Sequence, residues 1–208
     1  MSSLAHRLAA APSLRIGREP PVRITAIVIV GSTCAGKTTL ANAIRRAALA
    51  GVDVPRRFVT RAPRPDDVAD EAGYVTCDEL DGAITAGRVR LHWSRTLEAG
   101  HVERYGFATP RAGALPVYSA NNAVCTAADL SNVLVVGVFA PDDLRARRLR
   151  ARSPELCAER PEEVSARLAE RADVVLPHAH VVIENHGTLE PAALHDIVAL
   201  VRACRRRR

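Results

Sequence analysis

The residues best suited to chemistry form one short segment near the start of the chain. Its sequence fits the pattern G-x-x-x-x-G-K-[ST], which wraps the phosphates of a bound nucleotide. Small residues let backbone N–H groups face the phosphates, a lysine reaches the β- and γ-phosphate oxygens, and a hydroxyl can bind Mg²⁺. We therefore predict a site for ATP and Mg²⁺, with Lys37 catalytic and Thr38 the metal ligand. The predicted nucleotide-binding residues are Gly31, Ser32, Thr33, Cys34, Ala35, Gly36, Lys37, Thr38 and Thr39.

Two elements flank this segment and would position it. Residues 24–30 form an apolar run that predicts a buried strand, and residues 39–50 favour a helix that ends near Gly51. A glycine turn that arose by chance after a strand would explain Gly31 and Gly36, but not the Lys37-Thr38 pair beside them. The setting therefore favours a phosphate-binding loop.

The remainder of the chain alternates between strand and helix patterns. Strands are expected at residues 88–93, 116–120, 134–139 and 181–184, and helices at 78–86, 142–152, 161–172 and 191–203. Residues 54–70 carry prolines and clustered arginines, which favour a surface or a site over a core. Alternation of this kind predicts an α/β fold with a mainly parallel central sheet and right-handed crossovers.

Length and composition limit the possible classes of protein. A chain of 208 residues with 48% hydrophobic content suits one domain, and no apolar run reaches the roughly 20 residues needed to span a membrane. The five cysteines form no metal-binding pair, which favours a reducing, cytoplasmic location. Part of the net charge of +6 comes from a terminal arginine run, so we do not expect a nucleic-acid partner.

These patterns predict how the chain is divided. We expect a flexible extension over residues 1–22, a single domain over 23–203 and a basic tail over 204–208. Within the domain we place an acceptor-binding region at about 54–110 and a lid at about 142–170. A monomer or a homodimer fits these features equally well.

Several further segments resemble the guanylate kinase superfamily. Residues 58–67 read F-V-T-R-A-P-R-P-D-D, similar to the acceptor-binding pattern T-R-x-P-R of that family, and residues 148–152 read R-L-R-A-R, similar to its lid. The other matching segments are Gly73-Tyr74, Arg104-Tyr105-Gly106, Ala166-Arg167-Leu168 and Val182-Ile183-Glu184-Asn185. The resemblance covers roughly residues 24–202. It implies a three-layer P-loop kinase fold with a small acceptor-binding subdomain and a helical lid.

The resemblance also implies roles for particular side chains. The acceptor's phosphate would be bound by Arg61, Arg64, Tyr74 and Tyr105. The lid arginines Arg148, Arg152 and Arg167 would close over the transferring phosphoryl group and count as catalytic. Arginine suits both tasks because its planar fork pairs two phosphate oxygens and stays charged. Alternatively, the arginines of residues 145–152 form a solvated helix face.

Departures from the guanylate kinase pattern bear on the substrate. His92 stands where that family has a guanine-reading glutamate, and Phe107 replaces a serine or threonine that contacts the base. Ser119 and Asn121 replace two aspartates. These departures resemble the ribose 1,5-bisphosphate phosphokinase branch, and imply that His92, Ser119 and Asn121 bind a different acceptor.

Four functions remain open at this level. The leading one is ATP-dependent phosphoryl transfer to the phosphate of a small acceptor such as ribose 1,5-bisphosphate. Such an acceptor is already anionic and needs no strong general base. The alternatives are a nucleoside monophosphate kinase, a kinase of hydroxyl acceptors with Asp53 as the nearest downstream base, and a non-catalytic guanylate-kinase-like interaction module.

Overall fold

The computed structural model describes residues 14–63, 72–96, 100, 102–127, 129–159, 161–169, 175, 177–187 and 191–205. The strands are β1 (Arg15–Ile16), β2 (Ala26–Val30), β3 (Val52–Asp53), β4 (Arg57–Val59), β5 (Ala72–Tyr74), β6 (Val89–Thr96), β7 (Val102–Ala108), β8 (Leu115–Ser119), β9 (Val133–Phe139) and β10 (Val181–Glu184). The helices are α2 (Lys37–Arg46), α3 (Cys77–Thr85), α4 (Val124–Ala127), α5 (Asp142–Arg152), α6 (Pro154–Glu159), α7 (Pro161–Leu168) and α8 (Pro191–Arg205).

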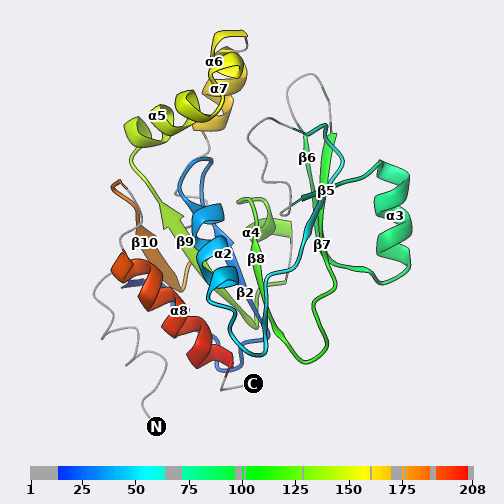
Figure 1. Ribbon diagram of the computed structural model, residues 1–208, viewed down its shortest axis with the longest axis vertical. Coiled ribbons are helices and arrows are strands. Elements are labelled where there is room, and N and C mark those ends of the chain that lie inside the picture. Colours follow the sequence, from blue (N-terminus) through cyan, green and yellow to red (C-terminus); the bar gives the residue numbers. More distant parts are fainter. Residues whose placement is uncertain are drawn as a thin grey trace.

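A six-stranded central sheet carries the fold, in the order β1-β10-β9-β2-β8-β3 (Figure 1). The five strands from β10 to β3 run parallel, and only β1 pairs antiparallel, with β10. The predicted α/β class with a mainly parallel sheet is confirmed.

Burial on both faces explains the apolar run of the central strand β2. Ile27 and Ile29 face one side, where they pack with helices α2 and α8, while Val28 and Val30 face the other side. A parallel strand that is covered on both faces reads as a continuous hydrophobic run, as this one does. The strand is therefore fixed in position immediately before the phosphate-binding loop.

A second, smaller sheet lies beside the central one, in the order β5-β4-β7-β6. Its outer face is covered by α3 through a small apolar cluster that includes Phe58 and Leu80. Its inner face contributes Trp93, Tyr105 and Phe107 to the same cluster as Val28 and Val30 of the central sheet. The small sheet is therefore packed against the central sheet through aromatic side chains.

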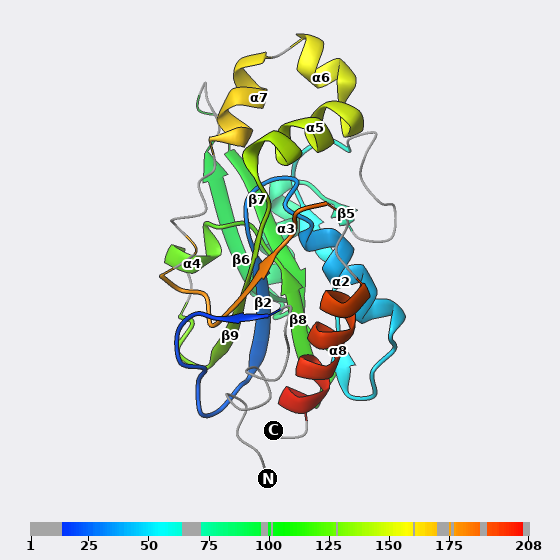
Figure 2. The same cartoon turned by 90° about the vertical axis from the view of Figure 1, so that its left-hand side faces the viewer.

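Helices α5, α6 and α7, which span the predicted lid, lie beyond the carboxyl end of the central sheet (Figures 1 and 2). Helix α5 begins directly after β9, with Pro141 at its N-cap and Asp142 and Asp143 in its first turn, where they complement the helix dipole. Helix α6 was not expected from the sequence.

The chain ends depart from the expected division. Leu14 is buried in the core and Arg15–Ile16 pair with β10, so this part of the predicted flexible extension belongs to the sheet. Helix α8 continues through the buried Cys204 into the predicted tail. Within the described residues, no helix is long and apolar enough to cross a membrane.

Candidate active site

Parallel strand order brings four chain segments together at one edge of the sheet. The phosphate-binding loop follows β2, Ser119 ends β8, Pro141 follows β9 and Asn185 follows β10. Ligands of open α/β sheets bind at this carboxyl edge, where neighbouring connections leave in different directions. The predicted nucleotide loop lies there.

The backbone of the phosphate-binding loop requires its glycines. Gly31 has a φ of 147°, and a Cβ built on it would lie 2.1 Å from the carbonyl oxygen of Val138. Gly36, with a φ of 113°, forms the N-cap of α2. Lys37 then turns back over the loop, and its Nζ donates to the carbonyls of Gly31 at 2.6 Å and Ser32 at 2.9 Å. The loop is therefore curved around the lysine.

Three consecutive carbonyls of the loop are held from the lid side. Arg145 Nε donates to the oxygen of Thr33 at 3.0 Å, and Arg148 Nη1 donates to that of Cys34 at 3.0 Å. Asn185 Nδ2 donates to the oxygen of Ala35 at 2.8 Å. Helix α5 and the end of β10 thus fix the shape of the loop.

The structure distinguishes the predicted lid arginines. Arg148 contacts the loop and also donates to Asn185 Oδ1 at 3.0 Å and to the carbonyl of Gly187. Partial burial lowers the pKa of Arg148, although a guanidinium still stays protonated. Arg152 is exposed at the end of the same helix, and Arg167 lies in α7, with its side chain outside the described part.

Two loop contacts came from residues that the sequence had not indicated. Arg145 is buried, with 3% of its surface exposed, and pairs with Asp142 at 2.9 Å. Its three-residue spacing from Arg148 was the available signal, because such residues share a helix face. Asn122 Oδ1 accepts from the backbone N–H of Gly31 at 3.0 Å. The predicted neighbour Asn121 instead accepts from Ala123 N at 3.1 Å and stabilises the start of α4.

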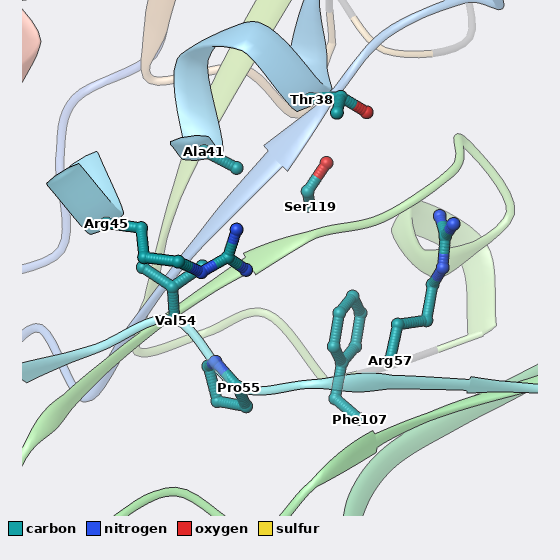
Figure 3. A pocket seen from close by; sticks show the side chains of 8 residues that line it. All are labelled: Thr38, Ala41, Arg45, Val54, Pro55, Arg57, Phe107 and Ser119. Carbon is teal, nitrogen blue, oxygen red and sulfur yellow. The ribbon is translucent and has the colours of Figure 1, made fainter. Parts of the chain in front are cut away.

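A small open hollow lies between α2, the end of β8 and the small sheet. Its lining residues are Thr38, Ala41, Arg45, Val54, Pro55, Arg57, Phe107 and Ser119. Figure 3 shows the Thr38 and Ser119 side chains at one end, with Arg45 and Arg57 on opposite sides. The hollow therefore adjoins the nucleotide loop, and its described lining contains arginines and hydroxyls but no carboxylate.

Aromatic side chains fill the space next to this hollow. Trp93 stacks on Tyr105 with ring centroids 5.3 Å apart, and Phe107 lies 5.6 Å from Trp93 and 5.0 Å from Tyr118. Tyr105, predicted to bind the acceptor's phosphate, is 8% exposed, and its hydroxyl donates to the buried carboxylate of Glu103. In this structure its ring is part of the packing.

The predicted pair Arg61 and Tyr74 is brought together. The guanidinium of Arg61 lies 5.9 Å from the centre of the Tyr74 ring, and its Nη1 donates to the carbonyl of Ala62 at 2.9 Å. Arg61 follows the end of β4, and Tyr74 lies on β5. Arg64 lies outside the described residues.

The structure places His92 away from the predicted acceptor-binding set. His92 pairs with Gly106 in the ladder, whereas Trp93 pairs with Tyr105, so His92 faces the opposite side of the small sheet. It is exposed on the α3 side, where it contributes to lowering the pKa of Asp81 after the larger effect of Arg104. The expectation that His92 takes the place of a base-reading group is therefore corrected.

Comparison with known proteins gives clear relatives, although no family model matches the chain. It is 32% identical over 172 residues to the ribose 1,5-bisphosphate phosphokinase PhnN of Pseudofrankia inefficax, covering 78% of this chain and 83% of that one. It is 30% identical over 175 residues to the enzyme of that name from Bradyrhizobium diazoefficiens, covering 79% and 81%. Among solved structures, guanylate kinase from Anaplasma phagocytophilum superposes with a TM-score of 0.54 at 18% identity, covering 88% of this chain and 89% of that one.

Proposed function

We infer the reaction of this protein from its family, because the chain belongs to the ribose 1,5-bisphosphate phosphokinases. This membership confirms the branch that the sequence resembles, and the protein is a kinase. We propose that it transfers the γ-phosphoryl group of ATP to a phosphate of ribose 1,5-bisphosphate. An oxygen of that phosphate would attack the γ-phosphorus, the bond to the β–γ bridging oxygen would break, and ADP would leave.

The nucleotide half of the reaction would use the loop at residues 31–39. Lys37 already has its Nζ over the loop, and would exchange two carbonyl contacts for β- and γ-phosphate oxygens. Mg²⁺ would neutralise developing phosphate charge, and the exposed hydroxyl of Thr38 suits it as one ligand beside phosphate oxygens and water. The non-catalytic alternative is less favoured, because every part of the loop that holds phosphate is intact.

The hollow beside Thr38 is the observation that carries the choice of acceptor. Among the residues that the structure describes, its lining offers two guanidinium groups, two hydroxyls and no carboxylate. A hydroxyl acceptor would need a nearby base, while a phosphate acceptor needs positive charge and positioning. Asp53, the base considered for a hydroxyl acceptor, is held by Arg111, whose backbone N–H lies 2.9 Å from Oδ2 and whose Nε lies 3.4 Å from Oδ1. This arrangement supports a phosphorylated acceptor.

The aromatic packing argues against a nucleotide acceptor. Phe107 stands where the resemblance predicts a base-contacting hydroxyl, and its ring packs between Trp93 and Tyr118. A guanine base in the hollow would find no carboxylate among the described lining residues for its N–H donors, at a cost of about 1 to 3 kcal/mol for each unpaired group. A sugar phosphate has no such requirement.

The arginines would divide between the two substrates. We propose that Arg61, with Arg64, binds the acceptor's reacting phosphate, since Arg61 follows the end of β4, four residues after Arg57 of the hollow. Arg148, Arg152 and Arg167 would act on the transferring phosphoryl group from the lid. Positive charge supplied by arginine is the main demand of a loose phosphoryl transition state.

A panel of acceptors tests this function. ADP formation would be measured with ribose 1,5-bisphosphate, ribose 5-phosphate, unphosphorylated ribose, and each nucleoside monophosphate. We expect a kcat/KM for ribose 1,5-bisphosphate at least about tenfold above that for GMP, a difference of about 1.4 kcal/mol. A value for GMP or for ribose that equals or exceeds it would overturn the proposal.

A further inference from the structure

The side chain of Arg57 has a buried polar atom that the protein leaves without a partner. Its Nε lies out of reach of water and makes no hydrogen bond among the described residues. A buried donor left unpaired costs about 1 to 3 kcal/mol, and among the described residues Arg57 is the one such side chain that also lines the hollow. The position of Arg57 indicates where that ligand would lie.

Arg57 is on β4, directly opposite Phe107 of β7, and both line the hollow beside the nucleotide loop. Directly opposed residues of an antiparallel pair point to the same face, so Arg57 faces the central sheet rather than α3. In Figure 3 its guanidinium stands across the hollow from that of Arg45. Val54 and Pro55 complete an apolar floor, which strengthens any charge interaction made there.

The hollow is long enough to separate two charged groups. Thr38, Ala41 and Arg45 line it from α2 at spacings of three and four residues, which puts them on one helix face. Seven residues at about 1.5 Å each place Arg45 roughly 10 Å along the helix from Thr38. One phosphate of a ligand can therefore lie near Thr38 while a second lies farther from the loop.

We propose that Arg57 binds the acceptor phosphate that does not react, and so makes the enzyme selective for a bisphosphate. This inference rests on the proposed function, since it assigns the second phosphate of that substrate. The planar guanidinium of Arg57, which lines the hollow, can donate to two oxygens of one phosphate. Arg45 supplies a second positive charge on the other side. An acceptor without this phosphate leaves the Arg57 guanidinium without a phosphate partner.

The proposal predicts which ligands bind less tightly when Arg57 is replaced. Ribose 1-phosphate and ribose 5-phosphate each carry one of the two phosphates, so only one of them reaches this arginine. In Arg57→Met we expect kcat/KM for ribose 1,5-bisphosphate to fall about ten- to hundredfold, the range for a lost charged hydrogen-bond pair. The inhibition constant of one monophosphate should rise about tenfold, and that of the other should change less than about twofold. KM for ATP should also change less than about twofold.

Two further variants control the experiment. Arg90→Met makes the same change at an exposed position of β6 outside this hollow, and should leave all constants unchanged. Arg57→Lys keeps a point charge without the planar fork. Its kcat/KM for ribose 1,5-bisphosphate should lie between the values of the wild type and Arg57→Met, provided that all three proteins have the same Tm. If the inhibition constants of both monophosphates rose equally, or if neither rose, the proposal would be overturned. A wild-type enzyme that does not turn over the bisphosphate would overturn the proposed function instead, while the two inhibition constants would still decide the role of Arg57.

Discussion

Replacing Asn185 should loosen the phosphate-binding loop from a distance. Asn185 is 3% exposed; its Nδ2 donates to the carbonyl of Ala35 at 2.8 Å, and its Oδ1 accepts from Arg148 at 3.0 Å. Asn185→Leu keeps the branching at Cγ but removes these two bonds, together with the longer one of 3.4 Å that Oδ1 accepts from the backbone N–H of Gly187. A neutral bond contributes about 1 kcal/mol and one from a charged group about 1.5 to 3, so we expect a loss of roughly 3 kcal/mol.

This loss should appear in two measurements. A domain of this size shifts its Tm by about 2 to 4 °C for each kcal/mol, so Asn185→Leu should unfold roughly 6 to 12 °C lower. KM for ATP should rise, because the nucleotide must then order the loop that Asn185 had held. Asn132→Leu is the matched control, since Asn132 is exposed beside the opposite end of β9. A variant with unchanged Tm and unchanged KM for ATP would refute the role of Asn185.

Three other perturbations test separate parts of the site and the fold. Lys37→Ala should lower turnover by at least about a hundredfold, whereas Tm should fall only a few degrees for the two loop contacts it loses; near-normal turnover would exclude this loop as the ATP site. Arg61→Ala should lower kcat/KM for the acceptor by about 2 to 4 kcal/mol while KM for ATP stays constant; the reverse pattern would contradict the assignment. Burial lowers the pKa of His180 from 6.5 to about 4, so His180 is neutral in the fold and protonated when unfolded at intermediate pH. Its contribution to stability is therefore complete above pH 6.5 and is lost as pH falls from 6.5 to 4; an NMR titration that protonates the His180 ring near pH 6.5 in the folded protein would disprove this.

The loop and the central sheet were predictable because their signals are local. The pattern from Gly31 to Thr38 lies within eight residues, and β2 and β9 are apolar runs that need no partner to be recognised. Helix α5 begins at the expected residue because Pro141 and two aspartates mark its start. Each of these features depends on a few consecutive residues.

The small sheet was less predictable because its strands depend on distant partners. Strand β4 is three residues long and pairs with β7, about fifty positions later, so its own sequence carries little signal. His92 shows the consequence. A side chain in a strand faces one side or the other according to its position, and an offset of one residue from Trp93 places it on the α3 face.

Arg148 can hold the loop and still act on the transferring phosphoryl group. A guanidinium has five N–H donors, and Arg148 uses one on Nη1 for Cys34 and two on Nη2 for Asn185 and Gly187. Among the described residues its Nε–H and the second N–H of Nη1 have no partner, and these donors would be available to a phosphate oxygen. The charge would then be fixed in place before ATP binds, and preorganised charge of this kind lowers a barrier without reorganisation during the reaction. The lid helix α5 would therefore contribute to catalysis through the same side chain that shapes the loop.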